Sequence, residues 1–541
     1  MSFRTKLCGA RRVHNDEQGI ALVTVLGLSL VLALLVTALL QYGLGSMRQA
    51  RYNQDWLAAL AAPDAGVDDF LARVNRDTDY WQIADDCTAC ATTLDPNNVA
   101  LTGYANIPDG DGQFTYDVDA SVVGTTGVLK IISTGRVNGV RRTVQAQMRR
   151  RGFLDYLYFT EYETLDPSAY PASGSRNQTW AAANCERHRY DSPTRHNDCY
   201  DITWANNDTV SGPFHSNDQI AVSGSPVWAG ETSTSRPDAQ YYDQAANRNC
   251  RARNNPSGCS SNPSFAQGLL YREPLVLPPS NNSIKAEADP AVFGDGCMYV
   301  GATSIRLNSN GSATIRSVRT DDASSSKCPT NGTMSSLPAN GVIYVRAAKS
   351  TESCLSSAPH GYNLSADVTS YDRCAGDVFV EGTLNGRLTI AAENNVIITN
   401  DIVYAGGRGA TSDDMLGLVA NNFVEIMHPV TSLGSDISYL PSSSRFDGPH
   451  IDAAILSVEH SFRVQNHDEG SAFSNPINLF GTIAQLYRGP VGTFSGSSTV
   501  TGYGKDYNYD PRLKYLSPPH FLDPVQSAWS VRTWSEEQNP P

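Results

Sequence analysis

The most apolar stretch of the chain lies near its start, from Gly19 to Leu40 (GIALVTVLGLSLVLALLVTALL). The 21 residues after Gly19 carry no charge, and only Thr24, Ser29 and Thr37 carry a hydroxyl. An α-helix rises ~1.5 Å per residue, so this stretch would be about 32 Å long, enough to cross a hydrocarbon core of about 30 Å. A cleaved secretory signal is the ordinary alternative. Its apolar region is only about 7–15 residues long and ends at a small-residue site, which is missing here.

The residues in front of the apolar stretch predict its orientation. Arg4, Lys6, Arg11 and Arg12 precede it, so the positive-inside rule puts the N-terminus in the cytoplasm and the bulk of the chain outside. The sequence therefore predicts a single-pass protein of the cytoplasmic (inner) membrane with a large extracellular part.

Apolar residues continue beyond the span at helical spacings of three, four or seven, at Leu57, Leu60, Val67, Leu71 and Val74. Asp64 interrupts this stripe, and Pro63 removes a backbone hydrogen bond, so we expect a kink or a break there. An amphipathic linker would show the same pattern.

Residues 112–150 have the alternation of a half-buried sheet. Phe114, Tyr116, Val118 and Ala120 alternate with polar residues, and residues 128–132 form a second short apolar run. The dipeptide at 138–139 (NG) predicts a two-residue hairpin turn before the alternating segment RRTVQAQMRR. The basic cluster at 149–151 is read as a surface patch or as a solvated strand end.

Beyond residue 160 the composition and the spacing of apolar residues change. Residues 160–290 are rich in Asn, Ser, Gly, Pro, Asp and Tyr, whereas from residue 341 short apolar runs recur between Gly, Asn or Asp residues. The pair Asn394–Asn395 precedes one such run and recurs as Asn421–Asn422 before another. Asn tolerates the left-handed conformation that tight corners demand. Short strands with paired-Asn corners and no helices between them favour a right-handed parallel β-helix over the alternative, a β-sandwich.

The predicted fold class is thus α+β, with a long N-terminal helix, a small antiparallel meander and a large solenoid. The expected segments are a basic leader (1–19), the extended helix (20–75), a small sheet domain (76–152), a loop-rich, disulfide-stapled start of the solenoid (153–340), the β-helix (341–501) and an aromatic, Pro-rich tail that packs along the solenoid or caps its end (502–541).

Charge and cysteine content narrow the picture further. The net charge is −14, and without the leader, which holds four basic and two acidic residues, it is −16. Such a balance argues against broad nucleic-acid binding. Cys8 lies in the leader, and the other ten cysteines fall into close pairs that predict structural disulfides outside the membrane. These pairs are Cys87 with Cys90, Cys185 with Cys199, Cys250 with Cys259, Cys297 with Cys328 and Cys354 with Cys374. A redox or zinc motif at Cys87–Cys90 is the alternative, but neither a βαβ context nor a second ligand pair is visible.

The short basic leader ending in Gly19, followed by the apolar run, resembles a type IV prepilin or pseudopilin signal. The resemblance covers mainly residues 1–75. It implies that a prepilin peptidase cuts between Gly19 and Ile20, that the apolar helix stays attached, and that the partners are other pilin subunits and the pilus assembly machinery. Most members carry Glu at the fifth position after the cut, where this chain has Thr24. A subunit without that Glu resembles the large minor pilins and pseudopilins that sit at a filament tip, some of which carry β-helix domains. An uncleaved signal anchor is the alternative.

Catalytic motifs are scarce. No nucleophile elbow, HExxH motif or P-loop is present. On a solenoid that acts on polysaccharide, the candidate residues would be Asp413, Asp414, Glu425 and Arg463, whose spacing is not specific. Asp109-Gly-Asp111-Gly resembles part of a calcium loop but lacks the later Glu, and His215 and the histidines between 428 and 467 are explained by surface or corner positions.

The sequence thus predicts a non-enzymatic minor pilin or pseudopilin without a cofactor, which displays a β-helix for assembly or for adhesion to a surface polysaccharide or host ligand. The alternative is a membrane-tethered enzyme acting on extracellular polysaccharide.

Overall fold

The computed structural model describes residues 18–77, 80–81, 98–108, 110–121, 123, 127–150, 152–206, 208–251, 258–293, 295–322, 327–357, 360, 369–437, 448–495, 498–525 and 528–537. The leader up to residue 17, the pair Cys87–Cys90 and Asp109 lie outside the described residues.

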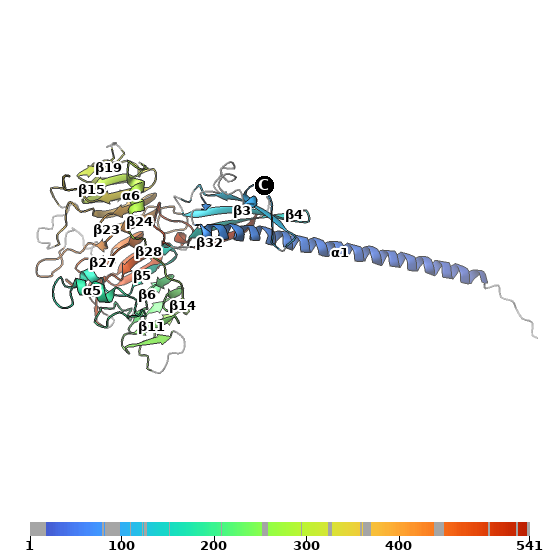
Figure 1. Cartoon of the computed structure of the whole chain (residues 1–541), viewed down its shortest axis with the longest axis horizontal. Coiled ribbons are helices and arrows are strands. Elements are labelled where there is room, and N and C mark those ends of the chain that lie inside the picture. Colours follow the sequence, from blue (N-terminus) through green and yellow to red (C-terminus); the bar gives the residue numbers. More distant parts are fainter. Residues whose placement is uncertain are drawn as a thin grey trace, which may run out of the picture.

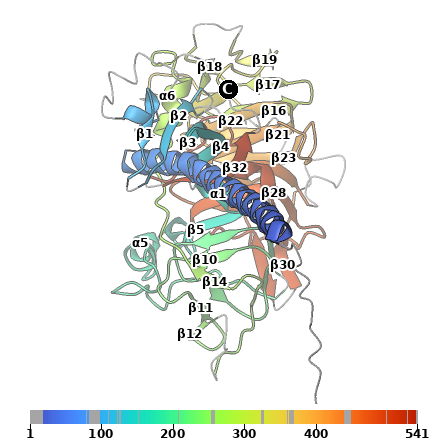
Figure 2. The ribbon, with the colours of Figure 1, turned by 90° about the vertical axis from the view of Figure 1, so that its right-hand side faces the viewer.

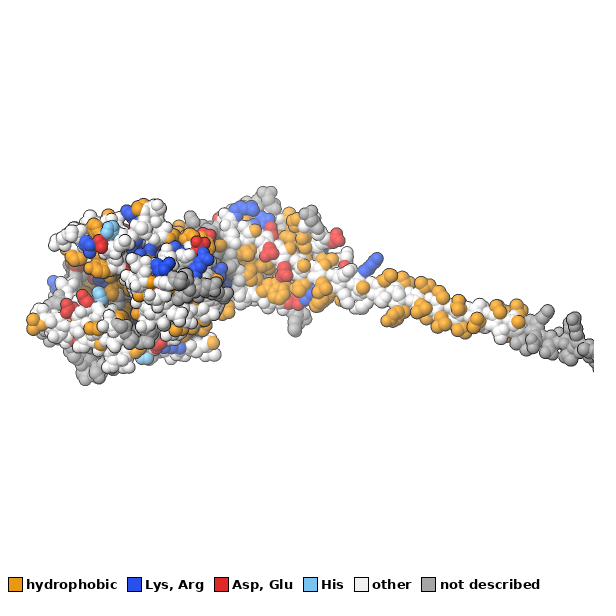
Figure 3. Space-filling model, turned by 90° about the horizontal axis from the view of Figure 1, so that it is seen from below, with side chains coloured by type: hydrophobic (Ala, Val, Ile, Leu, Met, Phe, Trp, Pro, Cys, Tyr) orange, Lys and Arg blue, Asp and Glu red, His pale blue; other side chains and the backbone are white. Residues whose placement is uncertain are grey.

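A single long helix, α1 (Gln18–Arg76, 59 residues), leaves the rest of the molecule as a rod (Figure 1). All side chains from Ala21 to Leu40 are exposed, and this part of α1 is long and apolar enough to cross a membrane. Orange apolar side chains line it in the space-filling view (Figure 3). The last turns of α1 instead pack on a sheet. Their buried residues include Ala59, Ala62, Val67, Phe70 and Val74.

The expected break at Pro63 is not observed, because α1 runs through this residue. Pro63 packs against Gly135 of the sheet, where an added Cβ would lie 2.2 Å from the Pro63 ring. The turns on both sides of Pro63 are held by the buried Ala62 and Val67, so packing offsets the one backbone hydrogen bond that proline removes. Leu57 lies outside this contact and is 64% exposed, unlike the rest of the predicted stripe.

The sheet beneath α1 is antiparallel, in the order β1-β2-β3-β4-β32. Its strands are β1 (Ala105–Asn106), β2 (Gln113–Asp119), β3 (Val128–Val137), β4 (Val140–Arg150) and β32 (Trp529–Glu537). Phe114, Tyr116 and Val118 are buried as their alternation predicts. Asn138 and Gly139 have φ angles of 48° and 87°, so the predicted hairpin turn is confirmed. The fifth strand, β32, comes from the far end of the chain.

The rest of the chain forms a large, mostly β domain. Its strands are β5 (Tyr158–Tyr162), β6 (Thr209–Ser211), β7 (Phe214–Ser216), β8 (Ala221–Val222), β9 (Val227–Trp228), β10 (Thr232–Thr234), β11 (Gln240–Asp243), β12 (Arg248–Arg251), β13 (Ser264–Phe265), β14 (Leu269–Tyr271), β15 (Cys297–Val300), β16 (Thr303–Asn308), β17 (Ser312–Arg316), β18 (Arg319–Thr320), β19 (Asn331–Met334), β20 (Val342–Arg346), β21 (Val378–Leu384), β22 (Arg387–Ala392), β23 (Val396–Tyr404), β24 (Met415–Ala420), β25 (Val424–Ile426), β26 (His450–Ser457), β27 (Phe462–Val464), β28 (Ile477–Tyr487), β29 (Gly492–Ser495), β30 (Ser498–Gly502) and β31 (Lys505–Tyr509). Its α-helices are α5 (Gln178–Cys185) and α6 (Asn282–Ala288), and its short 3₁₀ turns are η2 (Phe153–Asp155), η3 (Pro167–Ala169) and η4 (Pro511–Lys514). A further 3₁₀ turn, η1 (Val99–Leu101), lies beside the first sheet.

Most of these strands pair in parallel, in three ladders. The first ladder runs β14-β10-β7-β5-β28-β26-β24-β22-β20-β15. The second runs β13-β9-β6-β31-β28-β26, and the third runs β27-β25-β23-β21-β16. Figure 2 shows these strands stacked from β16 down to β14. Antiparallel pairs occur at the edges, as in β16–β17 and β11–β12.

In-register apolar columns fill the space between the ladders. Ile343, Ile390, Leu418, Ile455 and Ile483 occupy matching positions of successive strands, and all are fully buried. The column continues into the aromatic rings of Tyr158 and Phe214, which stack at 5.8 Å. Repeated apolar strands thus build one continuous core.

The order of strands differs from the expected domain boundaries. The chain enters the first ladder in its middle, because β5 lies between β28 and β7. It runs out to β14, crosses back past α6 to β15, and returns to β28. The loop-rich segment 153–340 therefore supplies both ends of the stack, with β14 to β5 at one end and β15 at the other, and the predicted β-helix segment 341–501 supplies the strands between them.

The crossing segment is held by the ladder that it passes. Asn281 donates its side-chain amide to the Ala392 carbonyl at 2.8 Å and accepts the Tyr344 hydroxyl at 2.8 Å. Leu275 and Ile284 are buried in the same apolar cluster as Tyr344. These contacts fix the crossing against the outside of the stack.

The paired asparagines lie at corners, as predicted, but their role is different from the expected one. None of the four has a positive φ. Asn394 instead accepts a hydrogen bond from the Asn422 amide at 2.5 Å, and Asn421 donates to the Glu393 carbonyl at 3.3 Å. The asparagines thus join neighbouring strands through their side chains.

Four of the five predicted cysteine pairs are bonded in the structure. They are Cys185–Cys199, Cys250–Cys259, Cys297–Cys328 and Cys354–Cys374. The pairing of Cys87 with Cys90 stays a prediction.

The C-terminal tail does more than pack along the large domain or cap its end. β31 is a strand inside the second ladder, and Leu513 and Leu522 pack on the outside of the stack. The chain then returns to the first sheet, where β32 covers β4. The two units are therefore joined twice, between β4 and η2 and again between residue 522 and β32.

This return explains why Arg149 is not on a solvated strand end. Its side chain is 2% exposed and donates hydrogen bonds to the carbonyls of Leu513 and Leu516. Burial lowers the pKa of Arg149 and raises that of the neighbouring Asp523. The tail thus turns one predicted surface arginine into a contact between the two units.

Candidate functional site

Two features of the surface stand out as candidate functional sites. The first is the exposed apolar part of α1, with Gly19 and Ile20 in its first turn. Thr24 donates its hydroxyl to the Ala21 carbonyl at 2.9 Å, so this side chain is satisfied along the helix by a neutral group. The helix surface offers apolar contact area to a membrane or to other helices. None of the 20 exposed side chains from Ala21 to Leu40 is charged.

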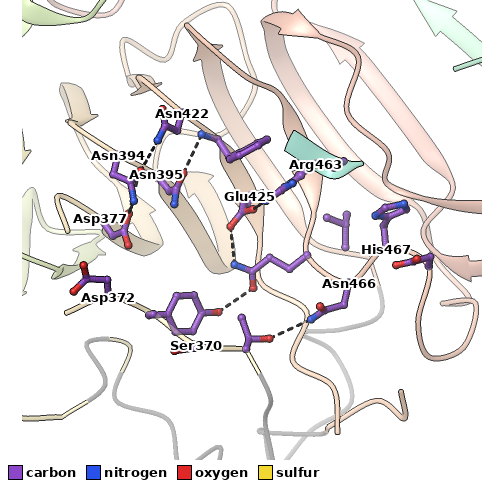
Figure 4. Close-up of a pocket in the computed structure, with 17 residues that line it drawn as sticks. Ser370, Asp372, Asp377, Asn394, Asn395, Asn422, Glu425, Arg463, Asn466 and His467 are labelled. Atoms are coloured by element: carbon purple, nitrogen blue, oxygen red, sulfur yellow. Dashed lines mark hydrogen bonds and ion pairs between the residues drawn. The ribbon is translucent and has the colours of Figure 1, made fainter. Parts of the chain in front are cut away.

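The second feature is a polar cleft of about 610 Å³ on the third ladder, drawn in Figure 4. Its lining residues are Ala169, Thr369, Ser370, Tyr371, Asp372, Asp377, Asn394, Asn395, Asn422, Phe423, Glu425, Arg463, Val464, Gln465, Asn466, His467 and Asp468. Residues 377, 395 and 423 directly precede the aligned strand starts Val378, Val396 and Val424. The cleft therefore crosses successive strands of the stack.

Side-chain hydrogen bonds hold one wall of this polar cleft. Asp377 Oδ1 accepts the Asn394 amide at 2.7 Å and the Asn395 backbone N–H at 3.0 Å. Asn395 Oδ1 in turn accepts the Phe423 N–H at 3.1 Å. Each corner thus positions the side chain of the next.

Two of the four candidate catalytic residues line the cleft. Glu425 accepts hydrogen bonds from Arg463 Nε and from the Gln465 amide, both at 2.7 Å, so both of its oxygens are used. The Arg463 guanidinium also lies 3.5 Å from the centre of the Phe423 ring. This pairing organises the floor of the cleft and leaves Glu425 poorly suited to proton transfer.

The structure does not bring the other two candidates to the cleft. Asp413 and Asp414 line a separate hollow with Ser309 and Asn385. Asp414 accepts the backbone N–H groups of Gly386 and Gly406 at 2.6 and 2.7 Å, so its carboxylate holds a turn.

Asp377 was not predicted from the sequence, and it has the most perturbed carboxyl group in the cleft. Burial raises the pKa of Asp377 from 3.8 to about 6, against the lowering effect of its bonds to Asn395 and Asn394. Its side chain is only slightly exposed, since the residue is 3% accessible. The corner position before an apolar strand was visible in the sequence, but its neighbours across the stack were not.

This shift predicts a pH dependence of stability. Because the folded pKa is the higher one, the contribution of Asp377 to stability is fully present below pH 3.8 and is lost as the pH rises through about 6. Two pH units correspond to about 3 kcal/mol. We expect the free energy of unfolding of Asp377→Asn, measured with denaturant, to rise by about that much relative to that of the wild type as the pH goes from 4 to 8. Asp413→Asn is the control, and a wild-type-minus-variant difference that stays constant with pH would contradict the prediction.

The histidines and a possible metal cluster have structural explanations. His215 is fully buried, not at the surface, and bonds to Ser233 and Asn217 at 2.9 and 3.0 Å. Asp243, Cys250 and Cys259 lie close together, but the cysteines form a disulfide and Asp243 accepts N–H groups from the 260–261 turn. In the described part of the chain, no other group of His, Cys, Asp and Glu gathers closely enough to hold a metal ion.

No protein-family model matches this sequence, and no curated protein matches it. Among solved structures, the chain is similar to the crystal structure of the competence-associated pilin ComZ from Thermus thermophilus. The identity is 14%, the match covers 89% of this chain and 97% of that chain, and the TM-score is 0.29. The identity and the TM-score are both too low for this likeness to bear on function.

Proposed function

We propose that this protein is a minor pilin or pseudopilin, a membrane-anchored subunit of a type IV pilus or a related filament. The observation that carries the proposal is α1, whose exposed apolar half projects from a second half packed on a small antiparallel sheet. Such a helix can stay in a membrane or pack with the helices of other subunits without changing its own fold. The partners would be a prepilin peptidase, other pilin subunits and the assembly machinery.

The sequence before the helix supports the same role. A basic leader ends at Gly19, and cleavage there would leave Ile20 at the start of the apolar helix. Thr24 cannot present a carboxylate to the amine of a neighbouring subunit, and a charge within hydrocarbon persists only where a partner satisfies it. The large β domain is also bulky for a position repeated along a thin fibre. Both features favour a low-copy position at a filament tip.

We further propose that the large β domain is a right-handed parallel β-helix displayed outside the cell for assembly or adhesion. The three parallel ladders and the in-register apolar columns support a solenoid. Binding is favoured over catalysis because the four candidate catalytic residues are divided between two hollows, and Glu425 is fully hydrogen bonded.

Processing at Gly19 gives the test. In the native host, protein from sheared filaments is expected to begin at Ile20, and Gly19→Val is expected to leave the basic leader attached in essentially all molecules. A small residue lets a protease approach the backbone, whereas a β-branched side chain blocks it. Mass spectrometry of the N-terminal peptide measures this, and peptide abundance against the major subunit gives the copy number.

Gly27→Val is the matched control, because an added Cβ at Gly27 meets nothing within 4 Å. Its N-terminus should again be Ile20. A wild-type N-terminus at Met1 in filament-forming cells, or an abundance equal to that of the major subunit, would overturn the proposal.

A further inference from the structure

We propose that the polar cleft of the large β domain binds a chain of uncharged sugar residues. This inference names a ligand class for the adhesive role and in that sense rests on the proposed function. Four observations carry it, and they concern the shape, the free polar atoms, the charge and the rigidity of the cleft.

The shape fits an elongated ligand. The cleft follows the aligned positions of β21, β23, β25 and β27, and neighbouring strands lie ~4.8 Å apart. Three such spacings cover about 14 Å. A pyranose ring is comparable in length to one spacing, so a short oligosaccharide can lie across the strands with one sugar unit per strand.

Polar atoms without protein partners face this space. Asp377 is 97% buried, yet within the described residues only its Oδ1 has hydrogen-bond partners, and its Oδ2 has none. The side-chain N–H groups of Asn395 are likewise without a partner in that part of the chain, because its Oδ1 alone is used. In Figure 4, Asp372, Asp377 and Asn395 lie on one side of the cleft, and Asn466 and His467 lie on the other. An acceptor and donors held at fixed spacing match the hydroxyl groups of a sugar.

The charge of the cleft excludes acidic ligands. Asp372, Asp377 and Asp468 form no salt bridge with any described residue, and the one cation, Arg463, lies 2.6 Å from Glu425. Burial lowers the pKa of His467, so this ring adds no charge at neutral pH. The excess of carboxylates repels phosphate, sulfate and uronate groups. The free carboxylate oxygen and amide N–H groups can bond uncharged hydroxyls without such repulsion.

The site is also rigid before any ligand arrives. The walls come from strand starts and from corners that hydrogen-bond to one another. The Phe423 ring packs against both the Arg463 guanidinium and the His460 ring, and the centres of the Phe423 and His460 rings are 4.4 Å apart. Few side chains need to be ordered on binding, which lowers the entropic cost.

The test is calorimetric titration of the full chain, kept soluble in a detergent without a sugar head group so that detergent cannot fill the cleft. The probes are neutral oligomers of hexoses and of N-acetylhexosamines, oligogalacturonate as the acidic series, and glucosamine oligomers as the cationic series. We expect binding to at least one neutral series, with affinity that rises up to about three units and then levels off, and no binding of oligogalacturonate.

Asp377→Asn is the decisive variant. Its Oδ1 can keep both structural hydrogen bonds, while the atom facing the cleft changes from an anionic acceptor to a donor. We expect about tenfold or greater loss of affinity. Asn395→Ala is a second variant with an expected loss of about two- to tenfold. Asp413→Asn, on the separate hollow, should bind within about twofold of wild type. Thermal unfolding checks that each variant is folded.

Absence of binding to every neutral series by folded protein would overturn the inference. So would unchanged affinity in Asp377→Asn, or binding confined to glucosamine oligomers or basic polypeptides and abolished by salt. Because the titration needs no filament, these results speak only to the cleft, whereas the N-terminal mapping speaks only to the pilin role.

Discussion

Replacing Arg195 by methionine is expected to lower the free energy of unfolding of the large β domain by about 3–5 kcal/mol, because the Asp218 carboxylate would be left buried without its paired cation, whereas Asp201 keeps its ion pair with Arg189. Arg195 is 1% exposed. Its guanidinium bonds Asp201 at 2.7 Å, forms a second ion pair with Asp218, and donates to the Arg187 carbonyl at 3.1 Å. The guanidinium of Arg195 therefore lies in the interior, where water cannot take its place beside the carboxylates.

Asp218 shows why the loss should be large. Burial by itself would raise the pKa of Asp218, but the charge of Arg195 and bonds from the N–H groups of Arg189 and Glu163 keep it below its usual value. Without Arg195 the carboxylate stays buried and loses its strongest partner. The loop from residue 186 to residue 201 contains no strand, so side-chain contacts hold it in place, among them the Arg195–Asp218 pair and the Cys185–Cys199 disulfide.

Arg176→Met is the matched control. Arg176 bonds Asp198 at 2.6 Å, but these side chains are 53% and 41% exposed, so the expected change is below about 1 kcal/mol. Denaturant unfolding followed by tryptophan fluorescence measures both variants in the full chain. Free energies of unfolding of Arg195→Met and Arg176→Met that differ by less than about 1 kcal/mol would contradict the prediction.

The second large effect concerns the C-terminal strand. A chain that ends after Val525 lacks β32, and we expect the small sheet to lose about 5 kcal/mol or more and to open while the large β domain stays folded. Trp529 is 3% exposed within the core beneath α1, and its backbone exchanges hydrogen bonds with the Asn75 side chain at 2.6 and 3.1 Å. Arg142 is 6% exposed and pairs with Glu536, so truncation would also remove the carboxylate partner of a buried guanidinium.

Hydrogen exchange measured by mass spectrometry reports this effect separately for each unit. Amides of β3 and β4 should lose protection, while those of β22 and β24 should keep it. A chain that ends after Glu537 retains β32 and is the control. Full protection of β3 and β4 in the shorter chain would show that β32 contributes little.

Several elements could be predicted from the sequence because their signals are local. The apolar run to Leu40, the alternation from Phe114 to Val118 and the dipeptide Asn138-Gly139 each depend on neighbours along the chain, and α1, β2 and the hairpin follow them. The cysteine pairs are local in the same way. Strands of two or three residues between 209 and 271 carry no readable period, so their places in the ladders were not predicted.

The cleft was predictable only in part. Glu425 and Arg463 were candidates from their residue types, and they lie opposite each other because β25 and β27 pair in register. The corner position of Asp377 was visible in the sequence, but its perturbed carboxyl group was not, because the perturbation depends on burial and on corners 17 and 18 residues away.

By itself, the sequence determined the apolar helix, the first hairpin, four of the five local cysteine pairs and the repeated short strands, since each is set by residues within a few turns or strand lengths. Only the tertiary structure decided that the chain enters the ladders at β5, that Arg149 is buried, and that β32 pairs with β4, which ends some 380 residues earlier. These features depend on pairings between distant segments. Such pairings are chosen by the burial and hydrogen bonding of the whole fold, and a local pattern of apolar and polar residues cannot specify them.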